Sequence, residues 1–357
     1  MRQSRNLPDQ GAGSIYDPVA RPEDELWFLP GAPEEPAETL PASRGAAGDA
    51  GLAEAWHEAQ AALALPLARA AGLFGALDER LSHAAGGAAE RLALLEATDL
   101  SWLAGERIAA DRLALWLGLR AGAAGEDAPA LARAAWAARR LAGGPGPETE
   151  PEALAAVLDR KEATPAQSAP HEDLRGRLAD WSAAMEAGAG LHPFTQAAFG
   201  FRAWRMAGLS GTGPAGDLEA MVVAERLAAG AGRGGALFLP LALAGPQASR
   251  TGGSVAERLA RWLDAAERSV LAALLHLDRL EAWRLRADAA CAHLSGRTPR
   301  LLIEVLAAWP LVSAPFAEEK TGASRAAVQR NLDLLSAKGL LREATGQGRY
   351  RMWSARL

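Results

Sequence analysis

A set of polar and arginine side chains near the C-terminus has the chemistry to bind nucleic acid. Its members are Ser324, Arg325, Gln329, Arg330, Arg349 and Arg351. The first four are expected on the N-terminal turns of one helix, where short polar side chains and arginine reach base edges or phosphates in the major groove of DNA. The two arginines near position 350 are expected on a hairpin that contacts phosphate or the minor groove.

The distribution of charge favours a local DNA-binding surface over a generally basic protein. The chain of 357 residues has a net charge of −5. Residues 297–357 contain ten basic and five acidic side chains, so they carry +5 and leave −10 for the remainder. Because binding to phosphates depends on the release of counterions by basic groups, only this C-terminal segment is suited to it.

Two helices are expected to precede the one that carries the four candidate residues. In "TPRLLIEVLAAWP", Thr298 is expected to cap the first helix, Pro299 to take its first position and Pro310 to end it. Ser313 is expected to cap the second helix, which ends at Gly322.

The third helix is expected to begin after Ser324 and to end at Gly339, with Val328, Leu332 and Leu335 facing inward. The segments "LLREAT" and "RYRMW", joined by "GQG", are expected to form two strands and a tight turn. This order of elements predicts a winged helix-turn-helix over residues 297–357. The alternative is a module of the same fold that serves only protein contact or dimerisation.

The rest of the chain is predicted to be mostly α-helical, in four segments. These are a largely disordered arm (1–47), a helical domain (48–142), a linker with a short helix (143–170) and a second helical domain (171–295). The second domain includes a long amphipathic helix near Ser254–His293, which is the candidate interface of a homodimer. Apolar side chains expected to line one face of this helix are Leu259, Leu263, Val270, Leu274, Leu277 and Leu285.

Two stretches resemble bacterial Fic-related proteins that end in a winged helix. They are "LHPFTQAAFGFRAW" (191–204), which is similar to the Fic active-site loop and the helix after it, and "LLREATGQGRYRMW" (340–353), which is similar to the closing hairpin. The resemblance implies a Fic-like helical body over residues 171–295. Fic enzymes transfer AMP or related groups through an HxFx(D/E)GNGR loop, whose acidic residue holds Mg²⁺ and whose glycine-rich turn holds phosphates.

Only the opening of that loop is retained here. His192 and Phe194 match it, but Gln196 replaces the acidic residue and residues 197–200 read Ala-Ala-Phe-Gly in place of Gly-Asn-Gly-Arg. Upstream, "SWLAG" has Ala104 where the inhibitory motif of many Fic proteins has glutamate. We therefore expect a catalytically degenerate body without catalytic residues, in which His192 is a structural residue before a helix. The alternative is a divergent Fic-type AMP transferase with a regulatory winged helix.

Other chemistry is not expected. A single cysteine, Cys291, cannot form an internal disulfide, and the histidines lack the spacing of metal ligands, so no metal or cofactor is predicted. "GTGPAG" (211–216) is interpreted as a glycine loop without a dinucleotide. Asp99, Glu106 and Asp111 are expected to be solvated, and His276 to be packed within its helix.

These inferences predict a cytoplasmic transcriptional regulator, whose Fic-like body serves dimerisation or the sensing of a ligand. The expected partners are double-stranded DNA and a second copy of the chain, because one winged helix reads only a few base pairs. No membrane partner is expected, since no apolar stretch is long enough to span a bilayer.

Overall fold

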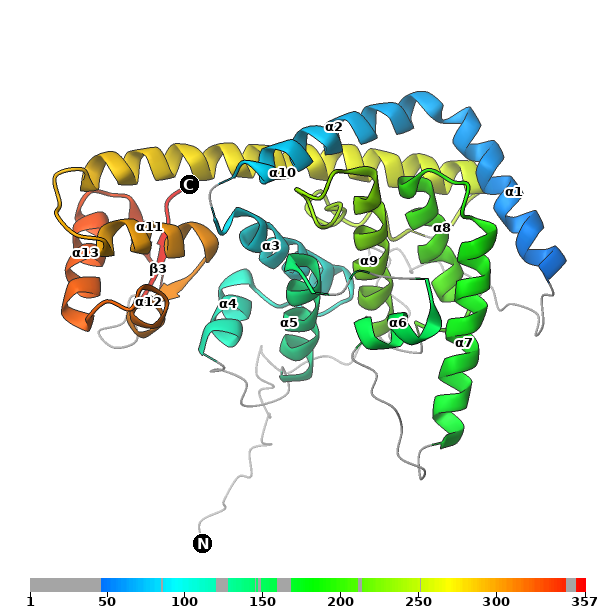
Figure 1. Cartoon of the computed structure of the whole chain (residues 1–357), viewed down its shortest axis with the longest axis horizontal. Helices are drawn as coiled ribbons and strands as arrows, with labels where there is room; N and C mark the ends of the chain where they lie inside the picture. The colour runs from blue at the N-terminus through cyan, green and yellow to red at the C-terminus, as the bar shows by residue number, and fades with distance from the viewer. Residues whose placement is uncertain are drawn as a thin grey trace, which may run out of the picture. The chain divides into compact units, whose positions relative to one another are not determined.

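The computed structural model describes residues 46–84, 86–119, 128–144, 146, 149–158, 168–210, 214–250, 252–344 and 351–357. It confirms a mostly α-helical protein (Figure 1). The predicted N-terminal arm lies outside the described residues, apart from its last two residues, which begin the first helix.

Helices make up nearly all of the regular structure before residue 297. They are α1 (Ala46–Ala62), α2 (Ala64–Ser82), α3 (Ala88–Leu103), α4 (Ala110–Leu119), α5 (Ala128–Ala142), α6 (Pro151–Val157), α7 (Ser168–Ala187), α8 (Pro193–Met206), α9 (Pro214–Ala228), the short 3-10 helix η3 (Ala229–Ala231) and α10 (Val255–Cys291).

The C-terminal module, residues 297–357, adds three helices and a small sheet. Its elements are α11 (Thr298–Ala308), β1 (Val312–Ser313), α12 (Ala314–Thr321), α13 (Arg325–Ala337), β2 (Leu341–Glu343) and β3 (Met352–Ala355).

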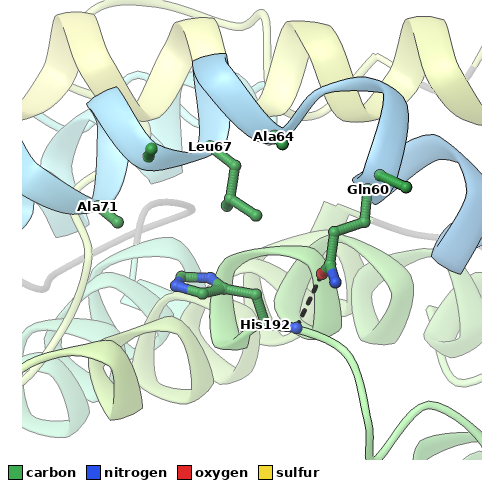
Figure 2. A pocket seen from close by; sticks show the side chains of 7 residues that line it. Gln60, Ala64, Leu67, Ala71 and His192 are labelled. Carbon is green, nitrogen blue, oxygen red and sulfur yellow. Dashed lines mark hydrogen bonds between the residues drawn. The ribbon is translucent and has the colours of Figure 1, made fainter.

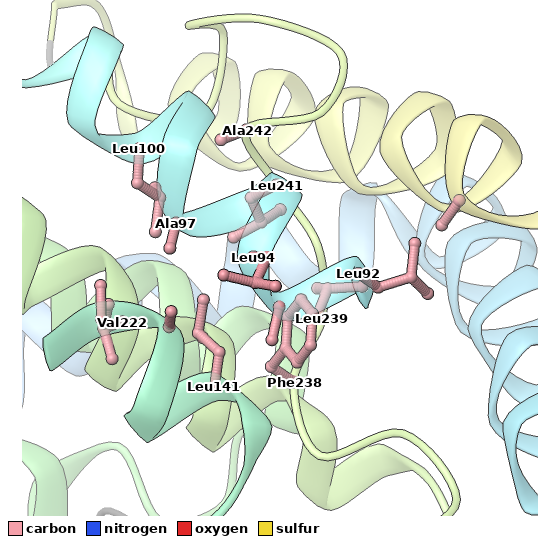
Figure 3. Close-up of a cluster of buried hydrophobic side chains, with 14 of the residues drawn as sticks. Leu92, Leu94, Ala97, Leu100, Leu141, Val222, Phe238, Leu239, Leu241 and Ala242 are labelled. Carbon is pink, nitrogen blue, oxygen red and sulfur yellow. The ribbon is translucent and has the colours of Figure 1, made fainter. Parts of the chain in front are cut away.

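One apolar core joins the helices on both sides of the predicted linker. Helix α3 packs against α5, and both contact α9, which follows the linker. Leu94 and Leu100 of α3, Leu141 of α5 and Val222 of α9 meet in this core (Figure 3). The helices of residues 46–291 thus pack as one body, here called the body, where the sequence had suggested two domains divided at 143–170.

The longest helix, α10, packs along the body and also reaches the C-terminal module. Ser254 caps it through a capping box, since its Oγ accepts from Glu257 N and the Glu257 carboxylate accepts from Ser254 N. The helix packs on α1, α2 and α8 and also contacts α11 (Figure 1). The predicted apolar face is correct at Leu259, Leu263 and Val270, but Leu285 is exposed.

Two buried carboxylates hold the irregular segment 232–250 between α9 and α10. Asp78 of α2 accepts hydrogen bonds from Arg233 N and Ala236 N, and Glu96 of α3 accepts from Leu241 N and Ala242 N. Burial alone raises the pKa of Asp78, but its backbone hydrogen bonds bring the pKa below the ordinary value. Buried backbone groups that no helix or strand satisfies are paired in this way.

The module contains an antiparallel sheet with the strand order β1-β3-β2. Val312 pairs with Trp353, and Arg342 pairs with Ser354. Strand β1 was not predicted, because two residues are too few to show a pattern. The predicted turn "GQG" and the first two residues of the segment "RYRMW" fall within residues 345–350, outside the described part of the chain.

The predicted caps of the module are confirmed for two of its three helices. Ser313 Oγ accepts from Phe316 N, and Ser324 Oγ accepts from Ala327 N. The prediction for Thr298 was wrong by one residue: it is the first residue of α11, whose N-cap is Arg297 without a side-chain hydrogen bond.

Among the described residues, no single helix has the length and apolar character needed to cross a membrane. The helices of residues 51–62 and 64–82, with a bend of 81° between them, have the length and composition needed to span a membrane only when they are taken together.

Candidate nucleic-acid interface

Helix α13 is held by one apolar face and leaves the other exposed. Val328, Leu332 and Leu335 are completely buried and lie at spacings of four and three. The helix begins directly after a sharp turn, in which Gly322 ends α12 with a φ of 63°. Because the left-handed backbone favours glycine, this residue sets the angle between the two helices.

Four of the six predicted DNA-binding residues come together on the first turns of α13. Ser324 is the N-cap, and Arg325 has 79% of its side chain exposed, with Nε 3.8 Å from Glu318 Oε1. Gln329 Nε2 donates to Asp333 Oδ1 over 2.9 Å. Arg330 is exposed, and no described residue pairs with it. These side chains are available to a partner at the positive end of the helix dipole.

Arg351 occupies a different environment. Its Nε donates to Glu343 Oε2 over 2.8 Å, and a second guanidinium nitrogen lies 3.7 Å from Asp333 Oδ1. The guanidinium also stacks over the Trp353 ring, 5.1 Å from its centroid. Arg351 thus connects β2 and β3 with α13, and we assign it a structural role in place of the predicted phosphate contact. Arg349 lies outside the described residues.

A buried arginine of the body holds the C-terminal module in position by hydrogen bonds. Arg91 of α3 donates through Nε to His276 Nε2 of α10, and through Nη1 to the carbonyls of Leu306 and Ala307 at the end of α11. Burial, and then the charge of Arg91, lower the pKa of His276 to about 4. His276 is therefore neutral and able to accept this hydrogen bond. The predicted packed role of His276 is confirmed.

Two further contacts join the body to the module. Trp283 Nε1 donates to the Leu340 carbonyl over 2.8 Å. Gly87 has a φ of +93° and approaches α11 so closely that an added Cβ would lie 2.4 Å from the Ala308 Cβ. The position of α13 therefore depends on contacts from α3 and α10.

The stretch that resembles the Fic loop is helical. His192 is the N-cap of α8, and its Nδ1 accepts from Phe194 N over 3.2 Å, which confirms its predicted structural role. Residues 197–200, which align with the phosphate-binding turn, are buried within α8. Their backbone N–H groups belong to the helix, so this stretch offers no open loop that could hold phosphates.

A buried pair of acidic residues was missed by the sequence analysis. Glu96 of α3 and Glu225 of α9 are fully buried, and burial raises the pKa of both carboxyl groups. The charge of Glu96 raises the pKa of Glu225 further, well above its ordinary value. Glu225 therefore favours its protonated form, and Glu96 anchors segment 232–250 by accepting from Leu241 N and Ala242 N.

Two of the three acidic residues expected to be solvated are not. Burial, followed by the charge of Glu96, raises the pKa of Asp99 to about 6. Glu106 pairs with Arg133 and has only 10% of its side chain exposed. Asp111 is exposed, as expected. The described residues contain no group of three or more acidic, cysteine or histidine side chains that could hold a metal ion.

A comparison of the chain with models of known protein families finds no match, and neither does a comparison with curated protein sequences.

Proposed function

We propose that the C-terminal module is a winged helix-turn-helix and that the protein is a DNA-binding transcriptional regulator. The order α11-β1-α12-α13-β2-β3, with β1 paired to the last strand, is compatible with that fold. The observation that carries the proposal is the exposure of Arg325 and Arg330 on the first turns of α13, with the half-buried Gln329 beside them, while Val328, Leu332 and Leu335 are buried. A helix presented in this way fits the major groove of B-DNA.

In this proposal the arginines of the module have two different roles, DNA contact and support of the wing. Arg325 and Arg330 contact phosphates or base edges, and Ser324 brings the helix N-terminus close to the DNA backbone. Arg351 holds the β2-β3 hairpin against α13 and so fixes the orientation of the wing. Further exposed basic side chains of the module, Arg297, Arg300, Lys338 and Arg342, add to its positive field.

We also propose that two copies of the chain pair through α10. Leu271, Leu275 and Leu285 are 47%, 51% and 65% exposed, and their spacing places them on one side of the helix. A two-fold pair would bring two copies of α13 to the DNA, which supplies the affinity and specificity that one module lacks. The body would then serve pairing and the positioning of the module.

The proposal is tested by the binding of the full chain to random genomic DNA fragments over a series of salt concentrations. The key variant is Arg325→Ala with Arg330→Ala. The matched control is Arg139→Ala with Arg175→Ala, which removes the same charge from exposed positions of the body away from α10.

Wild-type protein is expected to select particular fragments, with an affinity that falls as salt rises. If both arginines contact phosphates, the α13 variant should lower the slope of log affinity against log salt by about 2. The control should leave that slope unchanged. Absence of binding by the wild type at low salt, or an equal loss in both double variants, would overturn the proposal.

A further inference from the structure

The bend between α1 and α2 forms a pocket that none of the roles above uses. Its volume is about 320 Å³, near the lower end of the range for small-molecule sites. Four alanines and a leucine provide the apolar wall, and two polar side chains complete it. The lining residues are Gln60, Ala61, Ala64, Leu67, Ala68, Ala71 and His192. We call this the elbow pocket (Figure 2).

Both polar side chains of the elbow pocket have their hydrogen-bonding roles fixed by the backbone. His192 Nδ1 accepts from Phe194 N, so the proton of the neutral ring lies on Nε2. Burial lowers the pKa of His192, which keeps the ring neutral. Gln60 Oε1 accepts from His192 N over 2.8 Å, so its amide nitrogen remains a donor (Figure 2).

The pocket therefore offers two hydrogen-bond donors beside an apolar wall. None of its lining side chains is charged. Three helix termini border the pocket: the C-terminus of α1 near Ala61, the N-terminus of α2 at Ala64 and the N-terminus of α8, for which His192 is the cap. Two of these three are N-termini, whose partial positive charge favours an anion. Together, the donors, the helix N-termini and the alanines select a short apolar molecule that ends in an acceptor with a negative charge.

We propose that the elbow pocket binds a small carboxylate with an aliphatic or single-ring body. Its carboxylate oxygens would accept from His192 Nε2 and Gln60 Nε2, and its body would lie against Leu67 and the alanines of α2. The proposal does not depend on DNA binding, because both donors and the apolar wall belong to the body.

The test measures binding of hexanoate and of benzoate to the full chain without DNA, by titration calorimetry. Hexanol and benzamide, which keep the apolar bodies without the charge, are the comparison ligands. Nitrogen NMR of the protein labelled with ¹⁵N-histidine gives a second, site-specific measurement, since the Nε2 resonance of His192 should shift when a carboxylate accepts from it.

Two variants locate the site. Ala68→Leu fills the exposed side of the pocket, and Ala76→Leu is its control, because Ala76 is an exposed alanine of α2 that does not line the pocket. His192→Asn keeps a good N-cap but withdraws the Nε2 donor. His192→Asn should weaken carboxylate binding at least about tenfold, the loss expected for one hydrogen bond to a charged group. Ala68→Leu should weaken it at least as much, because the larger side chain occupies the space of the ligand.

The expected result is that at least one of the two acids binds more tightly than its uncharged analogue, with a shift at His192 and with loss in both pocket variants but not in Ala76→Leu. Failure of both acids to bind would overturn the proposal. Equal binding of the uncharged analogues would overturn it too, as would binding that Ala68→Leu leaves unchanged.

Discussion

Arginines of the C-terminal module show how surroundings decide what one type of side chain does. Arg330 projects from α13 without a described partner, whereas Arg351 bonds Glu343, approaches Asp333 and stacks on Trp353. A guanidinium that bonds one carboxylate through two nitrogens and lies beside a second has few donors left for phosphate. Arg330 is therefore suited to binding and Arg351 to stability.

Replacement of these two arginines should separate stability from DNA binding. Arg351→Ala is expected to lower the free energy of unfolding by about 1 kcal/mol, because its ion pairs are partly exposed and screened by solvent. Arg330→Ala should change it by less than about 0.5 kcal/mol, as is usual at exposed positions. Urea unfolding of both variants measures this difference, and equal losses of stability would contradict the assigned roles.

A half-buried acidic residue of the body, Asp99, should make stability depend on pH. Asp99 has an ordinary pKa of 3.8 and a pKa of about 6 in the folded protein. A carboxyl group whose pKa is raised by folding stabilises the folded state while it is protonated, and that contribution is lost as pH rises. The loss for Asp99 therefore falls between about pH 4 and pH 6.

Asp99→Asn should remove this part of the pH dependence. The variant is expected to unfold with a flatter profile between about pH 4 and pH 6, and to exceed the wild type in stability at pH 7 by on the order of 1 kcal/mol. Thermal and urea unfolding at several pH values provide the measurement. Asp111→Asn, at an exposed position, is the control and should leave the profile unchanged.

At the scale of elements, the sequence predicted those features that depend on neighbouring residues. The caps at Ser313 and Ser324 and the helix ends at Gly322 and Gly339 follow from local hydrogen bonds and backbone angles. The same local signals placed Arg325, Gln329 and Arg330 on one short helical surface.

Features that depend on residues distant in sequence could not be predicted. Segment 232–250 shows no regular spacing of apolar residues that would predict its conformation. Its conformation depends on Asp78 and Glu96 of other helices, whose carboxylates accept hydrogen bonds from its N–H groups. The ion-paired state of Arg351 depends on Asp333, which is brought near it by the fold. The continuity of the core across the predicted linker likewise arises from the packing of α3 and α5 on α9.

The contact of α3 with α11 provides a test of how the module is docked. Gly87→Ala should cost about 2 to 4 kcal/mol of stability, because alanine is strained at positive φ and its Cβ would collide with Ala308. Gly86→Ala is the matched control, since its Cβ would meet nothing within 4 Å. Calorimetric unfolding of both variants measures the difference, and an equal effect would show that the contact at Gly87 is not tight.

At the scale of the whole molecule, α10 belongs to the body and also touches the module. Because Arg91 and Trp283 tie the module to α3 and α10, a pair of chains formed through α10 would hold its two modules at a set separation. Binding to two half-sites would then favour operators with one spacing. The oligomeric state and the spacing preference are consequently parts of the same prediction.

The exposed leucines of α10 allow this prediction to be tested directly. Leu271→Glu with Leu275→Glu should convert a dimer into a monomer, because two copies would bring buried, unpaired carboxylates together. Ala256→Glu, at an exposed position nearer the N-terminus of the helix, is the control and should leave the dimer intact. Analytical ultracentrifugation over a range of concentrations measures the mass, and DNA fragments with one or two half-sites measure the consequence.

The monomeric variant should bind a single half-site as well as the wild type does, since α13 is untouched, and should lose its preference for two half-sites. That combination separates loss of pairing from damage to the module. A wild-type protein that remains monomeric at every concentration would exclude pairing through α10, and selective DNA binding would then have to come from one module alone.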